Sequence, residues 1–265
     1  MRAAILLAGF VVLANGVHAQ EGVRLYAAGS LKGALTEIAD AYTASGGQKV
    51  VKTFGPSGLL RQRIANGEPA EVFASANMTH PQALSAAGMS GPVALFARNR
   101  LCALTLPAVA VTPETLLERM LDPTVKLGTS TPKADPSGDY AFQLFDKADV
   151  VRPGAGKTLA AKALKLTGGP DSPPPPKDRV VYGVLVAKGA ADIFLTYCTN
   201  ALAARKEEPQ LAVVQVPENL AVGADYGLTV MKQAGPHARD FALFVLSIPG
   251  QEILARHGFT AVAVP

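Results

Sequence analysis

The sequence predicts an α/β fold in which parallel strands alternate with helices. Between residues 23 and 74, extended and helical apolar patterns follow one another as strand, helix, strand, helix, strand. Two of the strands pass into the next helix through a short turn that contains a serine, and a third such junction follows residues 125–128. Strands separated by single helices pair in parallel through right-handed crossovers, so these three observations together favour this fold class.

The first junction lies at residues 27–35. Apolar residues alternate with polar ones at 23–27, as in a strand, and then recur at helical spacing from Leu31 to Tyr42. Ser30, between them, can cap the helix by accepting a bond from one of its first amides, or it can turn outward and leave those amides to a ligand. The second arrangement would bind an anion, because a helix N-terminus carries free N–H groups and the positive end of the helix dipole.

A second junction repeats this pattern. A predicted strand at 49–54 is followed by Gly-Pro-Ser-Gly, with the serine at position 57, and by a predicted helix at 59–65. A turn at 66–69 ends that helix, and a buried strand is predicted at 72–74. Ligands of such sheets bind at the carboxyl ends of strands, so we expect Ser30 and Ser57 to face one cleft.

The remaining elements continue the alternation into a second domain. The apolar run 101–106 is predicted to carry the chain across, and a polar loop at 129–139 leads into a helix that begins near Tyr140. Residues 168–177 are predicted to form a loop, since four consecutive prolines exclude a helix. The other predicted elements are helices at 113–121, 180–188 and 236–258, the last broken at Pro249-Gly250, and strands at 125–128, 193–197, 211–216 and 227–231.

The N-terminus has the pattern of a secretory signal peptide. Arg2 precedes an apolar run of signal-peptide length, and Val17-His18-Ala19 is a small-residue cleavage pattern. We expect cleavage after Ala19, which removes 19 of the 265 residues and leaves 246. The alternative, a membrane anchor, is disfavoured because the run is short for a bilayer. The mature chain is therefore expected to be exported.

Composition excludes several classes of function. The formal net charge is +4, or +3 without Arg2, and the basic residues are spread along the chain, which gives nucleic-acid binding little support. The absence of tryptophan argues against a sugar site built from stacked rings. Neither cysteine lies in a CxxC pair or near a histidine cluster, so no metal centre is expected. Cys102 and Cys198 can form a disulfide in an oxidising compartment, or they can be two buried thiols.

Four segments resemble the periplasmic molybdate-binding proteins of ABC transporters. They are residues 27–31 (AAGSL), 54–62 (FGPSGLLRQ), 66–76 (NGEPAEVFASA) and 256–259 (RHGF). The resemblance implies a two-lobed type II periplasmic-binding-protein fold, each lobe a mainly parallel sheet flanked by helices, closing on its ligand through a two-strand hinge. It implies one lobe made of residues 22–98 and 227–265, a second of residues 99–226, and a hinge near 99–104 and 224–230.

The resemblance also implies a set of ligand-binding residues. Ser30 and Ser57 would give hydroxyl and amide bonds to an oxyanion, and Tyr197 its phenol hydroxyl. Val181 would give a backbone amide, and so would Ser137, which stands where the family has alanine. The ligand would be molybdate, with tungstate as a second ligand, and molybdenum would be held only through its oxygens. No cofactor, no enzymatic activity and no nucleic-acid partner are expected; the chain would be a periplasmic monomer that delivers the anion to a membrane permease.

Two charged residues near this predicted site depart from the family pattern. Asp139 would repel a dianion if it faced inward, and we expect it to point to solvent as a charge at a helix N-terminus. Lys32 could add long-range attraction, and we expect it to be solvated. Two rival functions stay open: a receptor for another small oxyanion, such as sulfate or thiosulfate, and a secreted hydrolase with Ser30 or Ser57 as nucleophile.

Overall fold

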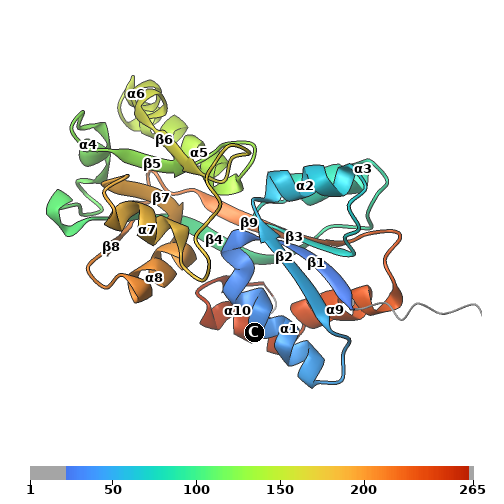
Figure 1. Cartoon of the computed structure of the whole chain (residues 1–265). Helices are drawn as coiled ribbons and strands as arrows, with labels where there is room; N and C mark the ends of the chain where they lie inside the picture. The colour runs from blue at the N-terminus through green and yellow to red at the C-terminus, as the bar shows by residue number, and fades with distance from the viewer. Residues whose placement is uncertain (1–21, 263–265) are drawn as a thin grey trace, which may run out of the picture.

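The computed structural model describes residues 22–262, and the predicted signal peptide lies outside this range. The described part of the chain is a mixed α/β structure with one continuous sheet in the strand order β2-β1-β3-β9-β4-β7-β5-β6. Helices flank this sheet on either side of a narrow middle (Figure 1). No helix between residues 22 and 262 is long and apolar enough to cross a membrane.

The first half of the sheet is formed by strands close together in sequence. β1 (Val23–Ala28) pairs in parallel with β2 (Val50–Gly55) on one side and β3 (Val72–Ser75) on the other. The connecting segments are η1 (Gly29–Leu31) with α1 (Lys32–Ala44), and α2 (Ser57–Ala65). The predicted βαβ arrangement of residues 23–74 is therefore confirmed, with α3 (Thr79–Ala86) following β3.

Two long strands connect the halves of the sheet. β4 (Ala94–Thr105) pairs with β9 (Gly223–Val230) as far as Arg100, and from Leu101 onward it pairs with β7 (Ile193–Tyr197). The change of partner within β4 falls inside the stretch predicted as a hinge. The run 101–106, predicted to carry the chain into a second domain, begins within β4, a strand that starts at Ala94 and reaches from one half of the sheet into the other.

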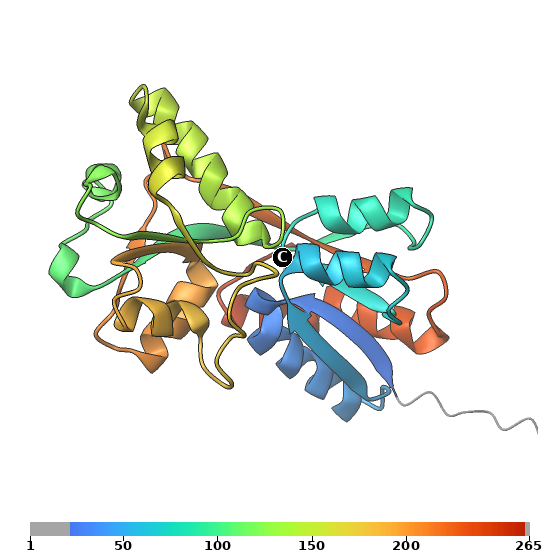
Figure 2. The ribbon, with the colours of Figure 1, turned by 45° about the horizontal axis from the view of Figure 1, so that its top comes forward.

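The second half of the sheet surrounds β7. β5 (Leu127–Ser130) pairs in parallel with β7 and with β6 (Leu164–Thr167), while β8 (Ala212–Gln215) pairs with β4. Its helical segments are η2 (Pro107–Val109), α4 (Leu116–Leu121), α5 (Pro136–Val151), α6 (Ala155–Lys162), α7 (Val181–Ala187) and α8 (Cys198–Glu207). Residues 168–180 contain no helix, as the prolines predicted (Figure 2).

Two predicted boundaries are wrong for local reasons. α5 begins at Pro136 and not near Tyr140, because proline fits the first turn of a helix and Asp135 caps it. The helical tail breaks at Ser247, between α9 (Pro236–Leu246) and α10 (Ile248–Arg256), and Pro249 lies in the first turn of α10. The last strand of the described residues is the short β10 (Thr260–Ala261), which pairs with β4.

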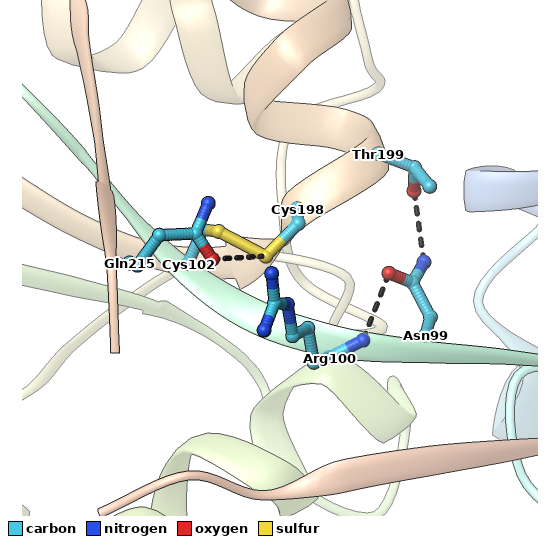
Figure 3. The surroundings of a disulfide bond; sticks show 6 residues. All are labelled: Asn99, Arg100, Cys102, Cys198, Thr199 and Gln215. Atoms are coloured by element: carbon cyan, nitrogen blue, oxygen red, sulfur yellow. Dashed lines mark hydrogen bonds between the residues drawn. A yellow bond between two sulfur atoms is a disulfide. The ribbon is translucent and has the colours of Figure 1, made fainter. Parts of the chain in front are cut away.

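A disulfide joins the middle of β4 to the start of α8. Cys102 and Cys198 lie with their Cα atoms 4.8 Å apart and their sulfurs bonded (Figure 3). Of the two possibilities open from the sequence, the structure therefore has the bonded pair. Because Cys198 directly follows Tyr197, the crosslink fixes the end of β7 to the strand that connects the two halves.

Replacing both cysteines by alanine is expected to lower the free energy of unfolding by roughly 2–5 kcal/mol, since the crosslink closes a loop of 96 residues in the unfolded chain. The midpoint temperature should fall by roughly 2–4 °C for each kcal/mol in a chain of this size. Calorimetric unfolding of the double variant and the wild type measures this difference. Free thiols found by alkylation of the exported wild-type protein would contradict the prediction.

Candidate functional site

A cavity of about 1300 Å³ lies between the two halves of the protein. Its first wall comes from the β1–α1 and β2–α2 junctions, and its second from the loop after β6 together with the starts of α7 and α8. Four of the five residues predicted to bind ligand line it: Ser30, Ser57, Val181 and Tyr197. Because these four come from four separate junctions, only the folded chain brings them to one place.

The backbone of Ala76, just after β3, connects two of these residues. Its N–H donates to Ser57 Oγ at 3.1 Å, and its carbonyl accepts from the Tyr197 hydroxyl at 3.3 Å. Ser57 is fully buried and Tyr197 nearly so. Since Ser57 Oγ already accepts a bond, its own hydrogen is free for another acceptor. Burial raises the pKa of Tyr197 well above its usual value, so the phenol stays a neutral donor.

Ser30 is not a helix cap, because no side-chain capping bond is made at the start of η1. Its Oγ lies 3.1 Å from the hydroxyl of the fully buried Tyr226, on β9. Asn99 Nδ2 lies 3.4 Å from the same phenol oxygen. It also lies 2.9 Å from Thr199 Oγ1, and Asn99 Oδ1 accepts the N–H of Arg100 at 2.9 Å (Figure 3).

The Arg100 N–H fixes the direction of this chain of bonds. A backbone N–H can only donate, so the Asn99 atom that it meets must be the oxygen, and the amide nitrogen must face Tyr226. Tyr226 then accepts from Asn99, and its own hydrogen is available to Ser30, although either hydroxyl can be the donor in that pair. When Tyr226 donates, the Ser30 hydrogen is left for the cavity, so Tyr226 and Asn99 are positioning residues for Ser30.

Val181 is the first residue of α7, and its preceding residue makes no side-chain cap. The first amides of a helix have no partner within the helix, so the Val181 N–H is a donor at the cavity wall. The side chain of Glu207 accepts the N–H of Val180 at 2.9 Å, which holds the entry into α7. Val181 thus lies where the resemblance predicted it.

The structure does not bring Ser137 to the cavity. Its N–H, expected to meet the ligand, donates to Asp135 Oδ1 at 3.0 Å. Its hydroxyl is buried without a hydrogen-bond partner in the described chain. Asp135 lines the cavity in its place, and burial raises the pKa of the Asp135 carboxyl to about 6.

The two charged residues that departed from the family pattern have partners away from the cavity centre. Asp139 Oδ1 accepts the N–H of Lys133 at 2.7 Å and so holds the loop before α5. Asp139 does not line the cavity and is only partly exposed, so it is not the solvated charge that was expected. Lys32 lies on the cavity rim, largely exposed as expected, with its Nζ 4.0 Å from Asp178 Oδ1 in the proline-rich loop.

Other charges around the cavity are also paired. Arg179 contacts Glu207 at 3.2 Å, and Arg256 contacts Glu37 at 2.6 Å. His257 Nε2 lies 2.8 Å from the same Glu37. Arg205 and Lys206, on α8, also line the cavity; they are exposed and take no part in these pairs. Residues 22–262 contain no cluster of three or more histidine, cysteine or acidic side chains that could hold a metal ion.

The two halves touch directly on one side of the cavity. The N–H of Gly58, in the first turn of α2, donates to the carbonyl of Ala134 at 2.9 Å. Figure 2 shows the start of α2 beside the loop that precedes α5. A Cβ at position 58 would lie 2.2 Å from the carbonyl oxygen of Lys133, so this approach requires glycine.

Sequence reasoning missed three residues at this site. Asp135 could have been found, since Asp followed by Pro is a local signal for a helix start. Tyr226 and Asn99 gave no such signal, because Tyr226 lies 196 residues from Ser30 and meets it only through the pairing of β9.

Comparison with known proteins connects this arrangement to a family. The family model of bacterial extracellular solute-binding proteins matches residues 23–260. Uncharacterized protein PM1146 of Pasteurella multocida is 36% identical over 238 residues, which cover 89% of this chain and 98% of that protein. The molybdate-binding protein ModA of Mycobacterium bovis is 27% identical over 280 residues, which cover 97% of this chain and 94% of ModA.

Solved structures agree on the fold. The sulfate-binding protein SubI of Mycobacterium tuberculosis has a TM-score of 0.78 at 18% identity, covering 92% of this chain and 88% of SubI. The periplasmic molybdate-binding protein of Azotobacter vinelandii has a TM-score of 0.72 at 19% identity, covering 91% and 99%. These matches confirm the resemblance noted in the sequence, and the chain belongs to the bacterial extracellular solute-binding proteins, with the fold of type II periplasmic binding proteins.

Proposed function

We propose that this protein binds molybdate between its two halves and delivers it to a membrane permease of the ABC type, with tungstate as a second ligand. The observation that carries the proposal is the convergence of uncharged polar groups on one cavity: the hydroxyls of Ser30 and Ser57, the amide of Val181 and, beside them, the Tyr197 hydroxyl, which in this structure donates to Ala76. In this proposal the halves are the predicted lobes, and they close by a hinge in β4 and β9.

Neutral donors suit a tetrahedral dianion. Its charge is spread over four oxygens, each able to accept more than one bond, and a bond to a charged acceptor is worth about 1.5–3 kcal/mol. Donors that are already oriented bind without the cost of ordering flexible side chains. The orientation of Ser30 by Tyr226, and of Ser57 by Ala76, supports this type of recognition.

The sequence relatives favour molybdate over sulfate as the ligand, whereas the fold does not distinguish between the two anions. ModA matches along nearly the whole chain, whereas the two solved structures, one named for sulfate and one for molybdate, share the fold at similar TM-scores. Selection between oxyanions would come from cavity size and from the number of donors that each anion leaves unpaired.

A binding role is favoured over the rival secreted hydrolase. In the described chain the hydroxyls of Ser30 and Ser57 bond to Tyr226 and Ala76, and neither is bonded to a histidine. Burial lowers the pKa of the His80 imidazole to about 4, which makes it a poor base. We propose a monomeric periplasmic receptor, consistent with the family and with the signal peptide predicted at residues 1–19.

Thermal unfolding with and without ligand tests the proposed function. Binding to the folded state alone adds RT ln(1 + [L]/Kd), about 2.7 kcal/mol at a hundredfold excess over Kd. Molybdate and tungstate should therefore raise the midpoint by several degrees, and sulfate should raise it much less. A shift with sulfate but none with molybdate would establish the rival oxyanion receptor.

Ser57→Ala should weaken molybdate binding by roughly 1.5–3 kcal/mol, because an oriented donor to a charged acceptor is lost. It should also lower stability, since the buried Ala76 N–H loses its acceptor. Ser75→Ala is the matched control, because Ser75 is equally buried next to Ala76, bonds only to Asn77 and does not line the cavity. Titration calorimetry should show near-native affinity for the control; equal losses in both variants would count against a ligand-binding role for Ser57.

A double-mutant cycle tests the orientation of Ser30. Tyr226→Phe should reduce affinity several-fold, and in the Ser30→Ala background the same change should have little further effect, because Tyr226 acts through Ser30. Fully additive losses would mean that Tyr226 acts on binding by another route.

Gly58→Val tests the contact between the halves. The branched side chain would collide with the carbonyl of Lys133, so the halves should be held apart and molybdate affinity should fall at least tenfold. Small-angle scattering should show a larger radius of gyration in the variant with ligand than in the wild type with ligand. Gly67→Val, in a turn where a Cβ meets no neighbour, controls for glycine replacement in general, although its positive φ adds local strain.

A further inference from the structure

Asp135 introduces a hydrogen-bond acceptor into a cavity of donors. Its Oδ1 accepts the N–H of Ser137 at 3.0 Å. The carboxylate is therefore bonded to the amide at the start of α5 from which an oxyanion would otherwise accept a hydrogen bond. Its Oδ2 lies against Gly168 in the loop after β6, where a Cβ would be only 2.6 Å from that oxygen. Both residues line the cavity, and a side chain at 168 would crowd Oδ2, so glycine leaves room beside this oxygen.

A carboxylate at this position and a fully ionised oxyanion repel each other. The repulsion between two negative charges a few ångströms apart in a partly buried site costs several kcal/mol. This cost exceeds the stabilisation from a hydrogen bond to one neutral donor. A proton shared between the two groups removes the repulsion and adds a hydrogen bond. The chemistry of the site therefore requires one proton in addition to the anion.

We propose that Asp135 determines which oxyanions this site accepts by binding them as a carboxylic acid, with one proton between its Oδ2 and a ligand oxygen. The inference rests on the proposed oxyanion function. A fully ionised anion such as molybdate takes this proton from solvent through Asp135, whereas a hydrogen oxyanion such as hydrogen phosphate brings its own. In either case Oδ1 keeps its bond to Ser137.

Among the groups around Asp135, the Asp135 carboxyl is the one that carries the proton. Burial is the main cause of the raised pKa of Asp135; the Ser137 N–H and the neighbouring Ser130 hydroxyl, on β5, lower the pKa, and Asp139, on the same helix, raises it further. From α7 and β7, Tyr182 and Tyr197 face it, and burial raises the pKa of both phenols above their usual value, so they stay neutral. Lys133, in the preceding loop, is exposed.

His257 is an imidazole on the cavity wall. It lies on the opposite wall, at the end of α10, and pairs with Glu37. Its contribution can therefore be separated from that of Asp135 by substitution.

The pH dependence follows from the sign of the linkage. The pKa of Asp135, raised to about 6, means that the free protein carries the proton below this pH and has lost it at pH 7 and above. Molybdate affinity should therefore be constant below about pH 6 and fall by up to tenfold for each pH unit above it.

Titration calorimetry with molybdate in two buffers of different ionisation enthalpy measures the protons taken up. At pH 7.5 the wild type should take up about one proton per molybdate. Asp135→Asn should take up none, bind molybdate more tightly than the wild type, and show an affinity independent of pH. The variant should fold, because asparagine Oδ1 can still accept the Ser137 N–H.

Two variants serve as controls. Asp139→Asn removes a carboxylate from the same helical turn without changing the cavity wall, and His257→Gln removes the imidazole of the cavity wall. Both should keep the proton uptake of the wild type. Loss of uptake in His257→Gln, or wild-type binding without uptake and without pH dependence, would overturn the proposal.

The same titration with inorganic phosphate distinguishes the source of the proton. Binding of phosphate without proton uptake, abolished by Asp135→Asn, would support the shared proton and would show that the ligand is a hydrogen oxyanion instead of molybdate. Failure of molybdate, tungstate, sulfate and phosphate to bind any variant between pH 5.5 and 8 would overturn the oxyanion function and this inference with it.

Discussion

The backbone of Ala76 connects the two sides of the cavity. Its N–H engages Ser57, at the start of α2, and its carbonyl engages Tyr197, at the end of β7. Both bonds are buried, so each partner would be costly to leave unpaired. The two halves meet at Ala76. The hydrogen bond from the Gly58 N–H to the Ala134 carbonyl is a second contact between them.

Rigid support explains how uncharged groups would form the proposed anion site. Tyr226 packs edge-on against Phe96 and Phe259, and its ring also contacts Tyr197, which fixes the position of its hydroxyl. The disulfide at Cys198 holds the residue next to Tyr197 to β4. Ser30, Ser57 and Tyr197 are thus held by hydrogen bonds to other parts of the described chain, and several charged residues around the cavity form ion pairs.

Asp135 and Ser137 show how one residue alters a site without changing the fold. The Pro-Ser-Gly turn at the start of α5 is a normal helix start, and Asp135 is an ordinary cap for it. In this fold, however, Asp135 also lines the cavity, so the cap places a carboxylate in the wall of the proposed ligand site. The local role and the effect on the ligand come from the same hydrogen bond.

The sequence by itself determined the alternation of strands and helices, the serines at the first two junctions, the proline loop and the family, because each is a local pattern of spacing or a contiguous motif. It predicted Ser30, Ser57, Val181 and Tyr197 as cavity residues. The tertiary structure alone decided that Ser137 turns its amide to Asp135, that Asn99 and Tyr226 orient Ser30, and that Cys102 meets Cys198. These contacts join residues brought together by the pairing of β4 and β9 or by the local path of a turn, and neither leaves a periodic signal in the chain.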